Sequence, residues 1–244
     1  MFNPHAPSIE ASTRSLVFQQ ALAAAFKARR QHVPPAPASL SALLDGVKQG
    51  VGGLLGRASC RDALGETRAR LFHVPGRDAE AQAWWHESVA AAVFAARVAE
   101  LKSGSVTASF MGGLLHRAGE SLALKILART ELDHRMKLDS ASRREWCTTH
   151  GPELAERLVR TWNLAPDIAS CTLGWIRFGE FPEASAESAA LYFGRLCAIE
   201  LLQPQFCVPG AIDHAAAALG LDASQVVEIR SADIRARELL RALD

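Results

Sequence analysis

Five cysteines are the most reactive side chains in this sequence, but their spacing suits neither a disulfide framework nor a structural zinc site. They are odd in number, widely separated, and form no C-x-x-C pair. Small buried thiols in a reducing compartment are therefore expected. No G-x-S-x-G turn or papain-like context surrounds a nucleophile, so no catalytic triad can be assembled from local signatures. The cysteines are Cys60, Cys147, Cys171, Cys197 and Cys207.

Phosphate-binding motifs and a basic surface are equally absent from the sequence. The glycine-rich stretch GVGGLLG at residues 50–56 lacks the preceding strand and the lysine of a phosphate-binding loop. The 244 residues include 27 basic and 26 acidic side chains, which leaves a net charge of +1. Nucleic-acid binding depends on a basic excess, so no nucleic-acid partner is expected. Lys27, Arg29 and Arg30 fall where a helix should end, and the helix dipole explains them.

The composition indicates a cytoplasmic globular protein. Hydrophobic residues make up 49% of the chain and aromatic residues 7%, which is an ordinary globular composition. The first twenty residues lack the basic start and apolar run of a signal peptide. No stretch approaches the roughly 18 apolar residues that a membrane-spanning helix needs. We therefore expect no membrane association.

The pattern along the chain is helical throughout, because Ala and Leu dominate and period-two strand signals are nearly absent. The prolines of HVPPAPA at residues 32–38 must interrupt the helices. Ser39 resembles an N-cap, and Asp222 with Gln225 resembles a capping box. The expected helices cover residues 9–31, 39–49, 59–72, 78–102, 105–129 (starting at Ser105 or Thr107), 140–148, 150–162, 166–177, 184–202, 211–219 and 222–243.

The segment 78–102 is expected to be a central helix. Its apolar residues fall at spacings of three and four, and alanines fill the neighbouring stripe, so it should be buried on most sides. A soft boundary near Gly76 to Asp78 divides the chain. We expect a helical N-terminal lobe at residues 1–76 and a helical body at residues 77–244.

Four segments in this order resemble the HDOD (HD-related output domain) family, a degenerate branch of the HD phosphohydrolase superfamily. VPPAP at residues 33–37 and SCRDAL at residues 59–64 resemble family landmarks as well. The stretch between these two is short, which implies an abridged N-terminal lobe. The resemblance covers about residues 33–243 and implies an all-α, multi-helix HD-like bundle. The four segments are WWHESVAAAVFAARVA (84–99), FMGGLLHRAGESLAL (110–124), HGPELAERLVRTWNLAPDI (150–168) and ESAALYFGRLCAIELL (187–202).

Catalytic relatives of this fold bind one or two divalent metals through a His, an adjacent His-Asp pair and a later Asp, because imidazoles and carboxylates hold the cation that activates water. In this sequence Glu87 stands at the first His position, with His86 one residue away and turned by about 100° on a helix. The pair is His116 and Arg117, and the later Asp is Arg195. A downstream histidine pair would fall near Gly174 and Trp175.

These replacements predict that the site holds neither a metal nor another cofactor and has no catalytic residues. Two Asp-to-Arg changes move the local charge by about four units, and each pair of unit charges ~4 Å apart contributes about 4 kcal/mol at an effective dielectric of 20. We interpret His116 as a structural histidine. Converging guanidiniums need anions, so one hypothesis is a salt-bridge plug in which Glu87, or more weakly Glu120, supplies the counter-charge. The alternative is an anion or nucleotide pocket formed by Arg117 and Arg195.

Three functions remain open at this point. The first is a non-enzymatic signal-transduction module that binds a protein partner in trans, which the resemblance implies to belong to a two-component or cyclic-dinucleotide pathway. The N-terminal helix or the last helix is the expected contact surface. The second is a nucleotide- or anion-binding sensor, and the third is a residual metal phosphohydrolase. Trp84, Trp85, Trp162 and Trp175 are interpreted as packing residues, and the sequence does not predict an oligomeric state.

Overall fold

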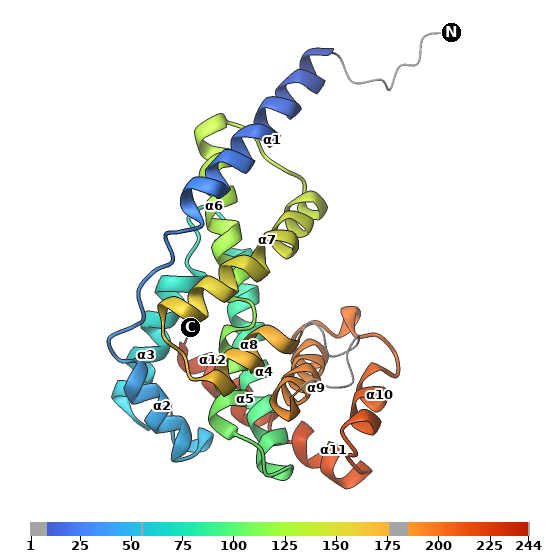
Figure 1. Cartoon of the computed structure of the whole chain (residues 1–244). Coiled ribbons are helices and arrows are strands. Elements are labelled where there is room, and N and C mark those ends of the chain that lie inside the picture. The colour runs from blue at the N-terminus through green and yellow to red at the C-terminus, as the bar shows by residue number, and fades with distance from the viewer. Residues whose placement is uncertain (1–8, 55, 176–184, 244) are drawn as a thin grey trace.

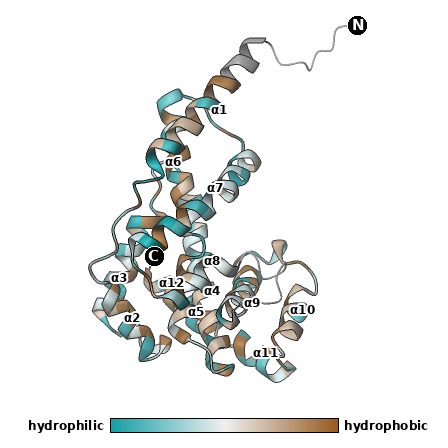
Figure 2. Ribbon diagram, viewed as in Figure 1, coloured by the Kyte–Doolittle hydropathy of each residue, from teal (hydrophilic) through white to brown (hydrophobic). Residues whose placement is uncertain are grey.

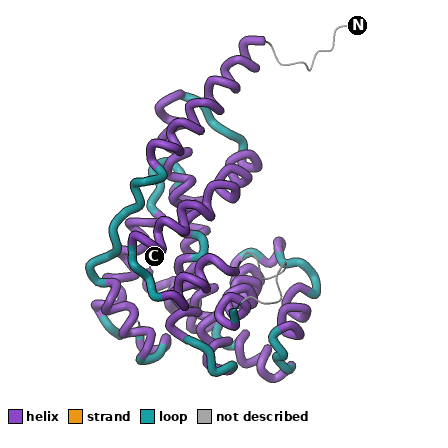
Figure 3. Tube along the Cα trace, in the orientation of Figure 1, coloured by secondary structure: helices purple, strands orange, loops and turns teal. Residues whose placement is uncertain are grey.

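The expected all-α fold is confirmed by a computed structural model, which describes residues 9–54, 56–175 and 185–243. Every regular element in these ranges is helical, and no strand occurs among them (Figure 3). Short helical turns at Val51–Gly53, Arg68–Phe72 and Pro204–Phe206 join some of the helices. The helices are α1 (Ile9–Arg29), α2 (Leu40–Lys48), α3 (Ala58–Thr67), α4 (Asp78–Leu101), α5 (Val106–Leu115), α6 (Ala118–His134), α7 (Ser140–Thr161), α8 (Pro166–Gly174), α9 (Ala186–Leu202), α10 (Ala211–Ala218), α11 (Ala223–Arg230) and α12 (Asp233–Leu243).

Helix α4 is the centre of the fold, as the periodicity of residues 78–102 predicts. It packs along α9 and α5 and also contacts α12 and α11 (Figure 1). Its residues from Glu87 to Ala96 are all buried, on every side of the helix. Alanine side chains add little width, so neighbouring helices approach the α4 backbone closely. This close approach brings side chains from several helices to one place on α4.

Helices α1, α6 and α7 form an extension on one side of this centre (Figure 1). Polar and apolar residues alternate along α1 (Figure 2), because one face of the helix packs and the other faces solvent. Phe18, Leu22 and Phe26 bury that face. The Phe26 ring lies edge-on to Trp146 with centroids 5.8 Å apart. The hydrophobic core is continuous from Phe18 to Leu240, and the boundary near residues 76–78 stays a prediction.

Two of the expected helix boundaries are wrong, and both lie near the contact between the start of α6 and the middle of α7. The segment 105–129 is not one helix, because the chain leaves helical geometry at Arg117 and forms α5 and α6. Residues 140–162 are one helix, α7, although a break was expected before His150 and Pro152 lies inside it. Packing decides both cases. Gly119 on α6 approaches the backbone of Gly151 on α7 so closely that an added Cβ would lie 2.2 Å from the Gly151 carbonyl oxygen, so α6 begins and α7 passes Pro152 at the same packed contact.

The C-terminal segment 222–243 also divides, into α11 and α12. Its start is predicted correctly, since the Asp222 carboxylate accepts from Gln225 N and the Gln225 side chain accepts from Asp222 N. The break after Arg230 turns α12 so that Ala236 and Leu239 are buried. Ser39 stands at the N-cap of α2, but its hydroxyl makes no capping hydrogen bond. The expected ends at residues 177 and 184 lie outside the described residues.

A membrane-spanning helix must be both long and strongly apolar. Within the described ranges, none is both long and apolar enough to cross a bilayer.

Candidate functional site

Two glycines bring the predicted site residues onto α4. A Cβ on Gly113 of α5 would lie 2.4 Å from Ala92 Cα, and a Cβ on Gly194 of α9 would lie 2.6 Å from Ala95 N. Only glycine permits backbones to meet this closely. His116 follows Gly113 by one helical turn and Arg195 follows Gly194 directly, so both side chains are held close to α4, within reach of Glu87.

The break between α5 and α6 orients the next two residues. The ring of His116 is buried, and its Nδ1 lies 2.6 Å from the Gly113 carbonyl oxygen. A carbonyl can only accept, so Nδ1 carries the proton and Nε2 of the neutral ring is an acceptor. Arg117 then adopts the non-helical conformation from which α6 begins. The two consecutive side chains therefore reach Glu87 from different directions.

Glu87 is the centre of the resulting ion cluster, which consists of Glu87, His116, Arg117, Glu120 and Arg195. Arg195 Nε donates to Glu87 Oε1 at 2.8 Å. Arg117 Nη1 lies 4.0 Å from the same oxygen. His116 Nε2 lies 3.6 Å from it, which is too long for a hydrogen bond, and this nitrogen has no hydrogen-bond partner among the described residues. All five sequence-predicted residues are thus brought together.

Glu120 supplies the second carboxylate of the ion cluster. Its Oε2 lies 2.9 Å from Arg117 Nε, three residues earlier in the chain. Glu87 and Glu120 together balance the two guanidiniums, because His116 is neutral. The cluster therefore carries no net charge, and each arginine has an acidic partner.

Two tryptophans complete the environment of the arginines. The guanidinium carbon of Arg117 lies 5.0 Å from the ring centroid of Trp84, and that of Arg195 lies 4.9 Å from the ring centroid of Trp175. Such cation–π contacts contribute about 0.5–2 kcal/mol, most where water is excluded. The sequence interpretation treated both rings as packing residues and missed these contacts. A signal was available, since Trp84 precedes Glu87 by one helical turn.

Burial and charge act in opposite directions on the two titratable groups at the centre. Burial alone would raise the pKa of Glu87, but the positive charges of Arg117 and Arg195 beside it outweigh burial and hold that pKa well below its usual range. Burial lowers the pKa of His116, and the two guanidiniums lower it further, while Glu87 opposes them. At neutral pH the carboxylate is ionised and the imidazole is uncharged.

The residues of the ion cluster do not fit the metal site of the HD superfamily. Among the described residues, no group of three or more His, Cys, Asp or Glu side chains could hold a metal ion. Of the available donors, Glu87 Oε1 already accepts from Arg195, and Glu120 contacts Arg117. A cation placed here would face two guanidiniums. No step of metal-assisted chemistry follows from these side chains.

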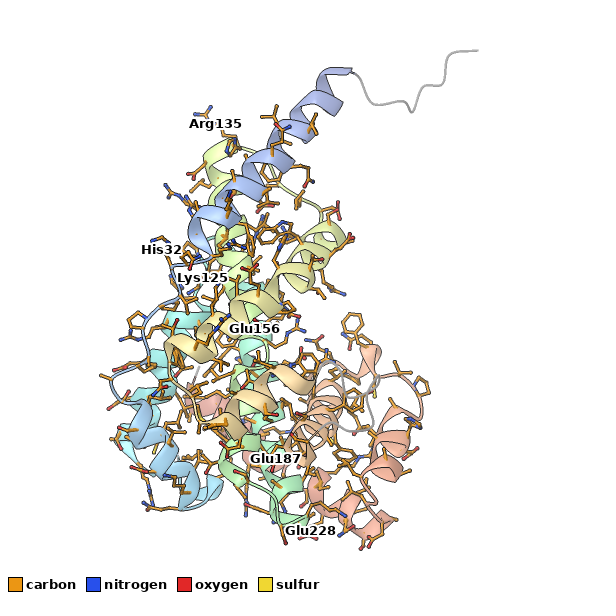
Figure 4. All side chains as sticks on the ribbon, viewed as in Figure 1. His32, Lys125, Arg135, Glu156, Glu187 and Glu228 are labelled. Carbon is orange, nitrogen blue, oxygen red and sulfur yellow. The ribbon has the colours of Figure 1, made fainter. Side chains whose placement is uncertain are left out.

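A cavity of about 420 Å³ opens beside the cluster, between α6, α7 and α8. His116, Glu120 and Trp175 form the wall that it shares with the cluster, and Glu156 of α7, labelled in Figure 4, lines another part. Arg117 and Arg195 are not among the described residues that line it. The charged groups at the cavity are therefore carboxylates.

Comparison with known protein families identifies an HDOD domain at residues 47–174, slightly more than half of the chain. A helical scaffold with an HD-like site whose ligand positions are replaced is consistent with this match. The chain belongs to the HDOD family, whose members are signalling-related HD-like domains. No curated protein and no solved structure matches the chain. The matched range includes Glu87, His116, Arg117 and Glu120, whereas Arg195 lies on α9 beyond it.

Proposed function

We propose that this protein is a non-catalytic, cytoplasmic signal-transduction module that acts by binding a partner protein in trans. The observation that carries the proposal is the ion cluster around Glu87. Arg195 donates to this carboxylate at 2.8 Å at a place where catalytic relatives hold a cation. In this cluster the carboxylates are balanced by arginines, so no metal ion is required to neutralise them. We infer that the scaffold functions through its surface, by binding another protein.

An anion or nucleotide sensor is the alternative that uses the same arginines. Two features favour the plug over this sensor. Each guanidinium already contacts a carboxylate and an aromatic ring. The neighbouring cavity presents Glu120 and Glu156, which repel a phosphate. A nucleotide would have to displace Glu87 from Arg195 before it could bind.

The partner surface is proposed from exposed apolar side chains on the two helices named in the sequence analysis. Leu16 and Val17 of α1 are 59% and 52% exposed, and Ile234 of α12 is 62% exposed. Apolar residues at such positions favour protein contacts when they are grouped. Leu16 and Val17 are adjacent on α1, which makes α1 the better candidate. A signalling protein of a two-component or cyclic-dinucleotide pathway is the proposed partner.

The proposal is tested in two steps on the full-length protein. Purified protein is first analysed for bound metal, and then assayed against phosphate mono- and diesters with manganese, iron or magnesium added. We expect no stoichiometric metal and no turnover. Tightly bound metal between α4, α5 and α9, or hydrolysis above background, would overturn the non-catalytic assignment. Stabilisation by a nucleotide that requires Arg195 would favour the sensor instead.

Affinity capture from the native host then tests the partner. The double variant Leu16→Asp/Val17→Asp should lose the captured protein, while Ile234→Asp, which changes an equally exposed residue on α12, should retain it. Loss through Ile234→Asp alone would move the surface to α12. Identical capture by wild type and both variants would exclude both helices.

A further inference from the structure

A second cavity, which shares no lining residue with the ion cluster, has a strongly basic wall. Its volume is about 250 Å³, and it lies between the end of α1, the proline-rich segment, the turn Arg68–Phe72 and α6. Arg29, His32, Arg70 and Lys125 line it together with apolar residues. We call these four residues the basic pocket, and Figure 4 labels His32 and Lys125 near the end of α1. No carboxylate lines the basic pocket within the described part of the chain.

Lys125 is the most unusual of the four residues. It lies on α6 between buried neighbours, and its own side chain is half-buried. Its Nζ donates to the Arg70 carbonyl oxygen at 2.5 Å, and no acidic group in the described ranges pairs with it. Burial lowers the pKa of Lys125 to about 8. An ammonium in this position destabilises the fold, a penalty that a methionine of similar length would not carry.

The two arginines of the basic pocket are also short of counter-charge. Arg70 Nη1 donates to the Pro35 carbonyl oxygen at 3.2 Å, and no carboxylate in the described structure is paired with it. Arg29 Nη2 lies 3.5 Å from Asp133, but Arg129 Nε lies closer to that carboxylate, at 3.1 Å. Arg29 Nη1 is buried and makes no hydrogen bond within the part of the chain that the structure describes. Among Lys125, Arg70 and Arg29, the structure therefore pairs only Arg29 with a carboxylate, that of Asp133, which also pairs with Arg129.

Part of the wall of the basic pocket is held by hydrogen bonds within the protein. The prolines at residues 34 and 35 hold an extended backbone. The Pro34 carbonyl accepts from Trp162 Nε1 at 2.9 Å, and the Pro35 carbonyl accepts from Arg70. Preorganised donors bind a ligand without an ordering penalty. The helix dipole, which explains Arg29 from sequence, does not explain why Arg29, Arg70 and Lys125 line the same cavity.

We propose that the basic pocket binds a phosphate group, either as inorganic phosphate or as the monoester of a small molecule. Guanidinium forks and an ammonium are the side chains that suit a tetrahedral dianion. The volume accommodates a phosphate group together with part of a small molecule that carries it, and the apolar residues of the wall would contact the carbon part of an ester. The anion would supply the counter-charge that Lys125, Arg70 and Arg29 lack.

The test measures anion binding by the full-length protein at constant ionic strength, by calorimetry and thermal unfolding. Inorganic phosphate and glycerol phosphate distinguish the two sources, and sulfate serves as a dianion that does not titrate near pH 8. We expect binding to wild type and binding at least about tenfold weaker in Lys125→Met, because one charged hydrogen bond is lost. Lys102→Met is the matched control, since Lys102 also donates to a carbonyl, that of Gly220, but outside the pocket.

Proton uptake provides a readout that a structural role would not change. Since burial lowers the pKa of Lys125 to about 8, part of the Lys125 population is uncharged at pH 8, so sulfate binding should take up protons in wild type and markedly fewer in Lys125→Met. Arg70→Ala is the second variant if Lys125→Met fails to fold. No binding to wild type, or equal binding and proton uptake by wild type and both pocket variants, would overturn the proposal.

Discussion

Replacing Glu87 by Gln should destabilise the protein by about 2–3 kcal/mol, because the change keeps the shape of the side chain and removes its charge. The attraction between Glu87 and Arg195 at 2.8 Å is about 6 kcal/mol at an effective dielectric of 20, before desolvation is subtracted. Removing one member of a buried pair typically costs about 3–5 kcal/mol. The Arg195 side chain is 24% exposed and Arg117 13% exposed, so solvent recovers part of this loss.

Urea denaturation and calorimetry measure this free energy, and each kcal/mol should correspond to about 2–4 °C in Tm for a chain of this length. A double-mutant cycle isolates the pair. Arg195→Met removes the guanidinium, and in the double variant Glu87→Gln/Arg195→Met neither charge is left without its partner. We expect a coupling free energy of about 1–3 kcal/mol. Glu156→Gln is the control, because Glu156 forms an exposed pair with Arg160 and its loss should change stability by less than about 0.5 kcal/mol.

Two results would refute the reasoning. Glu87→Gln could unfold at the same urea concentration as the control variant, which would mean that solvent already screens the arginines. Alternatively, the coupling free energy could be zero within error, which would mean that Glu87 and Arg195 are adjacent without depending on each other.

Three further predictions concern pH, packing and thiol reactivity. Burial lowers the pKa of His116 in the folded state, so the unfolded chain binds a proton at this imidazole at a higher pH than the folded chain does. The free energy of unfolding should therefore fall as the pH drops below about 6.5, by at most about 1.4 kcal/mol per pH unit for this group, and less steeply in His116→Gln. Equal slopes of unfolding free energy against pH for wild type and variant, measured by urea denaturation, would contradict this. Gly113→Ala should destabilise the protein by about 1–3 kcal/mol or more, because the new Cβ meets Ala92. Gly65→Ala, whose new Cβ has no described atom within 4 Å, should stabilise the protein by about 0.5–1 kcal/mol, as measured by thermal unfolding of both variants. Four cysteines are buried, and burial raises the pKa of three of them, Cys147, Cys171 and Cys197. Iodoacetamide should therefore modify only the half-buried Cys207 rapidly, as measured by mass spectrometry. A second adduct that forms equally fast would show that the core opens.

The all-α class and most helix positions follow from local sequence, because helix-forming composition and proline interruptions act within a few residues. Helix boundaries at Arg117 and Pro152 do not. The first depends on α5 packing onto the α4 backbone, and the second on contact between α6 and α7. Both contacts join segments tens of residues apart, so no local pattern reports them.

The ion cluster could be anticipated only through the family resemblance, which aligned Glu87, His116, Arg117 and Arg195 with ligand positions. The geometry of the contacts comes from the structure, as do the two tryptophan rings. The basic pocket was invisible in the sequence for a different reason. A lysine on an amphipathic helix is ordinarily exposed, and Lys125 becomes buried because two distant segments cover it.

The close fit of α9 against α4 has a practical consequence for anyone who wishes to express the recognised family segment alone. Cutting the chain after residue 174 would delete α9, and with it the guanidinium that neutralises Glu87 and the surface that covers most of the α4 alanines. Cutting before residue 47 would delete α1 and leave Trp146 without its aromatic neighbour Phe26. We expect such a fragment to expose interior surface on two sides and to aggregate, and we therefore expect a stable piece of the polypeptide to extend beyond residues 47–174 on both sides.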